Sequence, residues 1–158
     1  MLSLRYWFVA GLVISAPAFG QRQIAIEITH RGNDPAGQLL VAEMRQTIRV
    51  SEGALVSPSR RSEGAEDYHV RLTSELSRPR IRLQLLTAAA ESTASSAVFV
   101  SVVYDSPDMA LSGAFIRSMV ETCAPDDTAS CARRILEKAS TSMDWLRDNW
   151  PSLWKTLY

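Results

Sequence analysis

The feature that most constrains the fold is a set of segments in which apolar and polar residues alternate. In residues 23–30 (QIAIEITH) isoleucine recurs at every second position from Ile24 to Ile28, and residues 67–76 (DYHVRLTSEL) and 80–87 (RIRLQLLT) repeat the same period of two. This period is typical of a β-strand with one buried and one solvated face. Residues 97–105 (AVFVSVVYD) are apolar nearly throughout. We expect this last strand to lie centrally in a sheet, because both of its faces are apolar.

Other segments have helical spacing. Asp34 is placed to cap a helix that begins at Pro35, where a missing N–H costs nothing. Residues 111–122 (LSGAFIRSMVET) are expected to form a second amphipathic helix, because Leu111, Phe115, Met119 and Val120 share one helical face. A longer helix is expected from about Thr128, followed by a short docked helix after Pro151.

The order strand, helix, several strands, helix, helix predicts an α/β (α+β) fold. We expect a two-layer sandwich in which a mixed, mostly antiparallel sheet of four to five strands has helices packed on one face. The three later strands are expected to form an antiparallel meander. The solvated face should then present these side chains: Glu27, His69, Arg71, Glu75, Arg80 and Arg82.

The amino terminus has the layout of a secretory signal peptide. One basic residue, Arg5, precedes an apolar run that ends at Ile14, and small residues offer cleavage after Ala18 or Gly20. An uncleaved anchor is the alternative, but the apolar run is shorter than the roughly 20 residues that span a bilayer. We expect residues 1–20 to be the signal peptide and residues 21–158 to form a single α/β domain with a helical carboxyl-terminal tail, periplasmic or secreted.

The charge balance excludes some partners. The chain has 17 basic and 17 acidic residues, so general affinity for nucleic acid is not expected. No integral membrane segment is expected once the leader is removed. No cofactor is expected, and the two histidines do not supply a metal site, which needs three or four ligands at close spacing.

The only two cysteines are Cys123 and Cys131, in the stretch CAPDDTASC. A metal site, a redox site and a disulfide are the alternatives. The cysteines lack a nearby histidine and the C-x-x-C spacing, and export places them in an oxidising compartment, which together favour a disulfide. The bond would link the end of one helix to the start of the next, with Asp126 and Asp127 as favourable charges at the amino terminus of the second helix.

The pattern resembles the amino-terminal domain of TolB and the CsgG-like domains of bacterial envelope proteins. The similarity covers roughly residues 23–122: a first strand, a helix resembling GQLLVAEMRQTIRVSEGALV, a polar hairpin, a strand ending in VVYD, and a final helix like SGAFIRSMVETC. It implies an envelope protein whose domain recognises other proteins and performs no chemistry. No site residue is carried over, and the cysteine loop and the tryptophan-rich tail depart from the pattern.

Candidate catalytic groups are few. His30 and His69 lie outside any recognisable nucleophile motif and are interpreted as surface histidines. Asp105 and Asp108 in YDSPDM could act as paired acid and base on a glycan, although Asp near Ser-Pro is also ordinary turn chemistry. The turn interpretation is preferred.

A group of basic side chains is the surface feature that points most clearly to a kind of ligand. The candidate binding residues are Arg71, Arg78, Arg80, Arg82 and His69. If the first two polar strands form a hairpin, the arginines gather on one face and could hold a phosphate, a carboxylate or an acidic partner. The alternative, which we prefer, is cross-strand pairing with Glu27 and Glu75.

The sequence therefore predicts a non-enzymatic exported protein that acts by protein–protein interaction at the bacterial cell envelope. A small envelope hydrolase or a glycan-binding or anion-binding domain is the alternative class, and a secreted inhibitor is a third. The partner is expected to be another envelope protein. The oligomeric state stays open.

Overall fold

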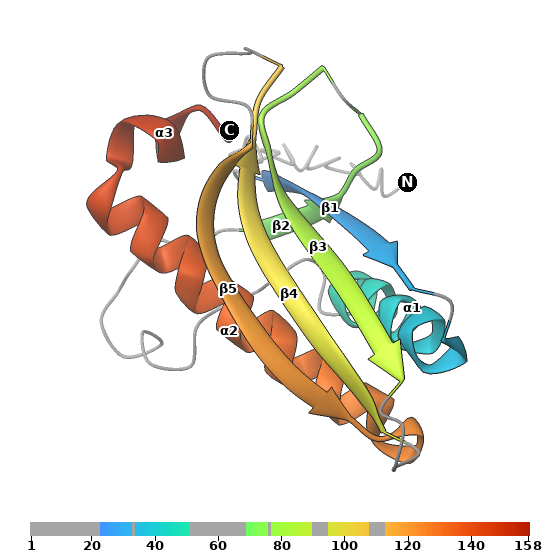
Figure 1. Ribbon diagram of the computed structural model, residues 1–158. Helices are drawn as coiled ribbons and strands as arrows, with labels where there is room; N and C mark the ends of the chain where they lie inside the picture. The colour runs from blue at the N-terminus through green and yellow to red at the C-terminus, as the bar shows by residue number, and fades with distance from the viewer. Residues whose placement is uncertain (1–22, 33, 51–68, 76, 90–94, 108–112) are drawn as a thin grey trace, which may run out of the picture.

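The computed structural model describes residues 23–32, 34–50, 69–75, 77–89, 95–107 and 113–158 (Figure 1). The predicted signal peptide and Asp108 lie outside these ranges. The strands are β1 (Gln23–Arg31), β2 (His69–Leu72), β3 (Arg80–Ala89), β4 (Ser96–Asp105) and β5 (Ala114–Cys123). The helices are α1 (Pro35–Val50), a 3-10 turn (Pro125–Asp127), α2 (Thr128–Asn149) and α3 (Pro151–Lys155).

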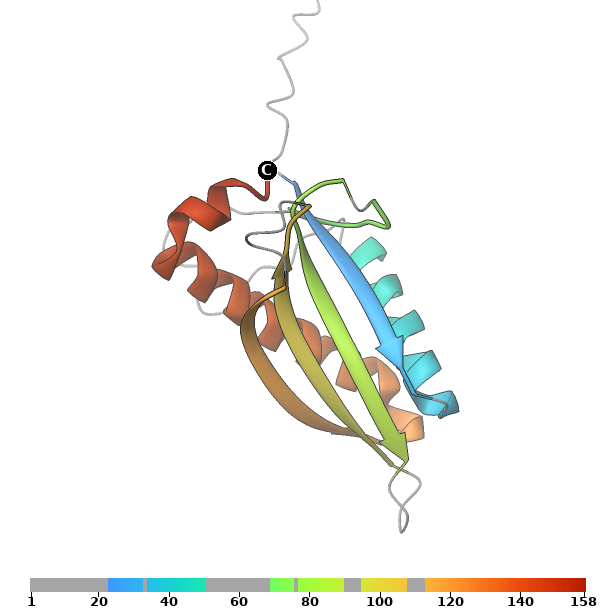
Figure 2. The ribbon, with the colours of Figure 1, turned by 45° about the horizontal axis from the view of Figure 1, so that its top comes forward.

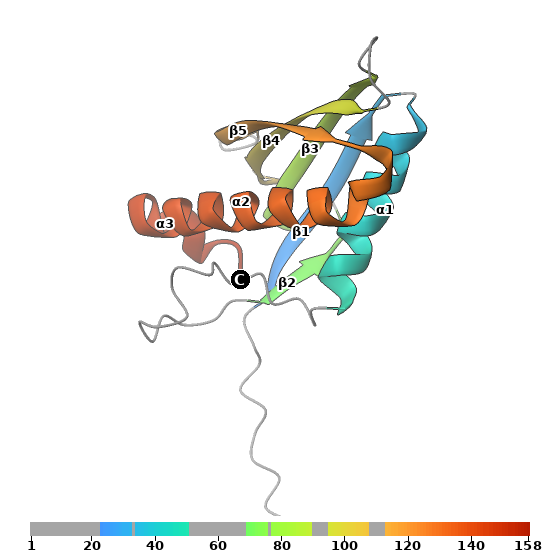
Figure 3. The ribbon, with the colours of Figure 1, turned by 90° about the horizontal axis from the view of Figure 1, so that it is seen from below.

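The strands form one mixed sheet in the order β2-β1-β3-β4-β5. β1 runs parallel to β2 and β3, whereas the longer β3–β4 and β4–β5 ladders are antiparallel. Figure 3 shows α1 and α2 on the same side of this sheet, and Figure 2 shows α1 beside β1. The predicted two-layer fold with helices on one face is confirmed. We call the other side of the sheet the open face.

The hydrophobic core fills the space between the sheet and the two long helices. Alternate residues of each strand point toward the helices, so the apolar residues of the period-two pattern become buried together. The strands contribute Ile24, Ile26, Ile28, Ile81, Leu83, Leu85, Val98, Val100 and Val102, and the helices contribute Leu40, Met44, Ile135, Leu136 and Met143. This burial fixes which polar residues are left for the open face.

The prediction of a helix at 111–122 is wrong, because residues 114–123 form β5, which pairs with β4 along its length. The ladder shifts register between Val102 and Val103, so that Ile116 is an extra residue between Arg117 and Phe115. A bulge of this kind interrupts the period of two. The interruption brought Phe115 and Met119 into a spacing that imitates a helix, although they lie on different faces of β5.

The predicted meander is also wrong at its first step. β2 pairs with β1 and not with β3, and β1 lies between them. The pairing continues past β2, where the Thr73 amide donates to the Ile26 carbonyl at 2.8 Å. Because α1 lies between β1 and β2 in the chain, the connection suits parallel strands, as in a βαβ unit. β1 therefore pairs with β2 over Gln23–Ile26 and with β3 over Ile26–Arg31.

The carboxyl-terminal tail is docked as predicted. After Pro151 the short helix α3 buries Trp154, and Leu157 beyond it is also buried. The Tyr104 hydroxyl lies 2.6 Å from the Thr156 hydroxyl, which ties the tail to β4. Trp150, in contrast, is half exposed. None of the helices that the structure describes combines the length and the apolar character of a membrane span.

Candidate functional site

Four charged side chains form a cluster on the open face. Glu27 on β1, Arg80 and Arg82 on β3, and Asp105 on β4 meet because the register places Glu27 beside Arg82 and Arg80 beside Asp105. Arg80 Nε and Arg82 Nε each donate to Glu27 Oε2 at 2.8 Å. Arg80 Nη2 lies 2.5 Å from Asp105 Oδ2, and Arg82 also contacts this carboxylate. We call these four residues the charge cluster.

Two of the predicted anion-binding residues, Arg80 and Arg82, belong to the charge cluster. The side chains of Arg80 and Asp105 are only 5% and 6% exposed, and both arginines bind carboxylates of this chain. This is the cross-strand pairing with Glu27 that the sequence favoured. Asp105 takes the second carboxylate position that was expected for Glu75.

The other predicted binding residues lie apart from the charge cluster. Arg71 is exposed on β2, and β1 separates it from β3. Arg78 is exposed before β3, and its carbonyl accepts a hydrogen bond from Arg80. His69 begins β2 opposite Gln23. The structure thus brings Arg80 and Arg82 together and does not place Arg71 beside them.

The pKa of Glu27 is set by opposing effects within the cluster. Burial alone would raise it, but hydrogen bonds and charge from Arg82 and Arg80 outweigh burial and hold the pKa below its usual value. The folded state therefore favours the ionised carboxylate.

Acidification is expected to remove this contribution. A carboxylate with a depressed pKa in the folded state stabilises the fold above its unfolded pKa, and the stabilisation is lost as the pH falls through the folded value. The loss should begin near pH 4.5, the usual value for glutamate, and continue below it. Urea unfolding from neutral to acidic pH should show wild type and Glu27→Gln furthest apart near neutrality and converging in acid. A separation that does not change with pH would contradict this assignment.

A second polar cluster lies where β1 and β3 end, beside the start of α1. His30 Nε2 is 2.7 Å from Thr87 Oγ1, and Thr87 donates in turn to Asp34. Asp34 also accepts from the Ser96 hydroxyl at 2.8 Å and from the Gly37 amide at 3.0 Å. The last bond confirms Asp34 as the cap of α1.

This His30 cluster is built to hold α1 rather than to move protons. The single Thr87 hydroxyl proton goes to Asp34, so His30 Nε2 must donate and is not available as a base toward this hydroxyl. Burial would raise the pKa of Asp34, but hydrogen bonds from Thr87, Ser96 and Gly37 lower it overall. A Cβ on Gly37 would lie 2.5 Å from Thr87 Oγ1, so only glycine allows α1 to approach this closely.

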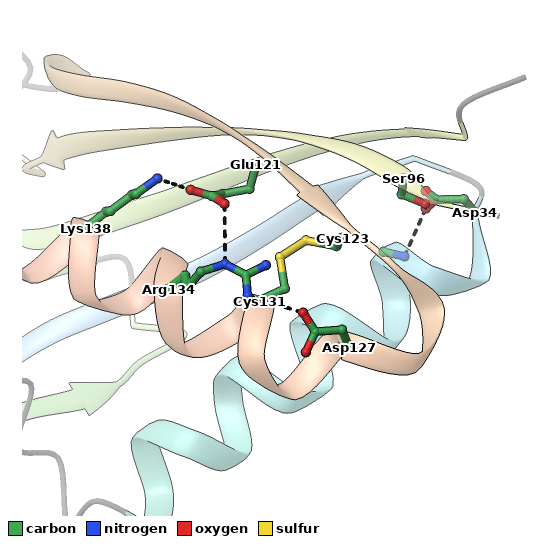
Figure 4. Close-up of a disulfide and its surroundings, with 9 residues drawn as sticks. Asp34, Ser96, Glu121, Cys123, Asp127, Cys131, Arg134 and Lys138 are labelled. Atoms are coloured by element: carbon green, nitrogen blue, oxygen red, sulfur yellow. Dashed lines mark hydrogen bonds and ion pairs between the residues drawn. A yellow bond between two sulfur atoms is a disulfide. The ribbon is translucent and has the colours of Figure 1, made fainter. Parts of the chain in front are cut away.

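The predicted cysteine pair is joined. Cys123 and Cys131 form a disulfide with a Cα separation of 5.7 Å, and both residues are buried (Figure 4). The bond links the last residue of β5 to the first turn of α2, a strand-to-helix link in place of the expected helix-to-helix link. The described residues contain no group of three or more side chains suited to a metal ion.

Ion pairs accompany the disulfide. Glu121 on β5 contacts Lys138 and lies 3.6 Å from Arg134, and Arg134 lies 3.2 Å from Asp127 (Figure 4). Hydrogen bonds from Ser130 and Arg134 lower the pKa of Asp127. As predicted, Asp126 and Asp127 immediately precede α2, where negative charge suits the helix dipole.

The open face also carries a row of exposed apolar side chains that the sequence did not predict. Leu86 on β3 pairs with Phe99 on β4, and Phe99 pairs with Val120 on β5. Their exposed fractions are 55%, 42% and 66%. We call these three residues the apolar row. Beside it a depression of about 550 Å³ is lined by Thr29, Arg31, Gln84, Leu86, Phe99 and Ser101, among others.

Comparison with known proteins assigns no family. No family model and no curated protein matches the chain in sequence. Among solved structures, a PelC dodecamer from Paraburkholderia phytofirmans is similar with a TM-score of 0.41 and 16% identity, over 78% of this chain and 86% of that chain. At this level of similarity, the likeness gives this chain neither a family nor a function.

Proposed function

We propose that this chain is an exported, non-enzymatic protein that binds another protein at the bacterial cell envelope through the open face of its sheet. The observation that carries the proposal is the apolar row. Its side chains are exposed on the side of the sheet opposite the hydrophobic core. Contiguous exposed apolar side chains bordered by polar ones are typical of protein interaction surfaces. The apolar row meets both conditions, because Gln84 and Ser101 border it.

The envelope location rests on the leader-like residues 1–20 and on the resemblance to TolB amino-terminal and CsgG-like domains. β1, α1 and β4 lie in the segments for which that resemblance expects strand, helix and strand, whereas β5 occupies the segment of its final helix and β2 pairs with β1 in place of its polar hairpin. The disulfide supports export, because such bonds persist in oxidising compartments.

The non-enzymatic part rests on how the candidate catalytic groups are occupied. Asp105 is 6% exposed beneath two arginines, so a substrate cannot reach its carboxylate. His30 donates its Nε2 proton into a structural cluster. Neither group has the access and the free partner that acid–base chemistry needs.

Site-specific photo-crosslinking in the full-length exported protein tests this function. A crosslinking amino acid at Val120 probes the open face, and the same group at Glu137, which is exposed on α2, is the matched control. We expect a discrete adduct with an envelope protein from Val120 and none from Glu137. Adding Leu86→Ser should weaken the adduct while the circular dichroism spectrum stays unchanged. Equal adducts from both positions, or none from Val120, would argue against the open face as the binding surface.

A further inference from the structure

We propose that the apolar row and Arg31 together bind a partner segment in which an acidic side chain is followed by apolar side chains. This inference rests on the proposed function and gives the chemistry of the partner. It begins from the register of the sheet, since Arg31 on β1 pairs with Leu86 and so extends the apolar row by one strand. Across four strands, the extended row consists of one cation followed by three apolar residues.

The dimensions of the extended row suit a short segment that crosses the strands. Neighbouring strands lie about 4.8 Å apart, so the row from Arg31 to Val120 spans about 14 Å. Every residue in it is exposed. A partner must therefore cover the apolar part and place its carboxylate at the β1 end.

Arg31 is the charged residue of the extended row. Arg80 and Arg82 are held by Glu27 and Asp105, whereas Arg31 forms no ion pair with any other residue in the described ranges. An exposed guanidinium retains its donors for a carboxylate from outside, and it can bind one in a bidentate manner. Charge complementarity therefore calls for an acidic group.

A polar row parallel to the first supplies hydrogen-bonding groups. Thr29, Gln84, Ser101 and Ser118 pair successively across the same four strands. The first three of these residues also line the depression. Their hydroxyl and amide groups can bind the backbone of a segment whose side chains cover Leu86 and Phe99. This arrangement fits a peptide better than a purely apolar ligand.

A second copy of this chain fits the row less well than a different protein. Within the five strands, the carboxylates on the open face are Glu27 and Asp105, and both are bound by Arg80 and Arg82. An open face packed against its own copy would bring Arg31 no carboxylate from these two residues. A heterologous acidic segment is the occupant that the charges favour.

Three synthetic peptides test the inference: acetyl-X-Ser-Leu-Ser-Leu-amide, with X as Glu, Gln or Lys, so that X and both leucines share one face of the extended peptide. Binding to the isotope-labelled protein is followed by nuclear magnetic resonance at the amides of Leu86, Phe99 and Val120. We expect the Glu peptide to bind about three-fold more tightly than the Gln peptide, as suits one exposed ion pair, and the Lys peptide to bind most weakly. Arg31→Glu should reverse this order.

Matched variants separate charge from apolar contact. Arg133→Glu, at an exposed position of α2, makes the same charge change on the helix side and should leave the order unchanged. Phe99→Ser should weaken all three peptides equally. The same order in wild type and in Arg31→Glu, or shifts confined to α2 and α3, would overturn the inference.

A further arm distinguishes peptide from lipid. Octanoate offers a carboxylate and an apolar chain without a peptide backbone, and we expect it to bind more weakly than the Glu peptide. Tight binding of octanoate with no binding of the peptides would assign the row to a fatty acid and overturn the inference. If Val120 forms its envelope adduct while the peptides show no preference, only the acidic chemistry fails. If the adduct itself is absent, the proposed function fails.

Discussion

Replacing Asp105 with alanine is expected to lower the free energy of unfolding by about 3 to 5 kcal/mol. The carboxylate is 6% exposed and lies against Arg80, whose side chain is 5% exposed, and against Arg82. Its removal leaves two guanidinium groups with Glu27 as their remaining carboxylate within the charge cluster. An incompletely paired buried charge costs more than the pair contributed, because water cannot replace the lost partner.

Urea unfolding at neutral pH measures this loss. The matched control is Arg71→Ala, which removes an exposed arginine from the same sheet and should change stability by less than about 0.5 kcal/mol. Asp105→Asn retains the shape of the side chain without its charge and should fall between wild type and alanine. A loss below about 1 kcal/mol for Asp105→Ala, within the range of an exposed ion pair, would show that Glu27 and solvent satisfy both arginines.

The parts of the fold that could be predicted are those in which one segment carries its own pattern. The alternation in residues 23–30 and 80–87 and the capping position of Asp34 depend on local geometry, and the structure has β1, β3 and α1 at these places. The two-layer arrangement followed, because each strand had one apolar face to bury. The Cys123–Cys131 bond was also predicted, because two cysteines without a nearby histidine in an exported chain favour a disulfide.

The errors arose where pairing between distant segments decides the structure. β5 could not be recognised from its sequence, because the bulge at Ile116 breaks its alternation. The segment forms a strand because it pairs with the free edge of β4. The position of β2 beside β1 was missed because adjacent polar strands suggest a hairpin. No local signal distinguishes these two pairings.

The same reason explains what was missed at the candidate site. Phe99 belonged to a strand assigned to the interior, and Val120 belonged to an assumed helix, so their meeting with Leu86 depended on the register of three strands. The contact of His30 with Thr87 likewise joins residues 57 positions apart. The pairing of Arg80 and Arg82 with Glu27 could be anticipated, because all three were expected on the solvated face of the sheet, where opposite charges on neighbouring strands attract.

Removal of the disulfide in Cys123→Ala/Cys131→Ala is expected to lower the free energy of unfolding by about 2 to 3 kcal/mol. The two residues are 8 positions apart, so the bond closes a short loop in the unfolded chain and removes a limited amount of its conformational entropy. Alanine is preferred to serine, because both positions are buried and a hydroxyl there would need a hydrogen-bond partner.

Ion pairs also connect the two elements that the disulfide joins, so the protein is expected to fold without the bond and its effect on stability can be measured. Glu121 binds Lys138 and lies near Arg134, so β5 stays attached to α2 through charge when the covalent link is absent. We therefore expect the double variant to fold with an unchanged circular dichroism spectrum but with a lower urea midpoint. Reduced wild type should match it. Adding Glu121→Gln should lower the midpoint of the double variant further. Free thiols counted by alkylation in the oxidised protein, or equal midpoints before and after reduction, would contradict a stabilising bond.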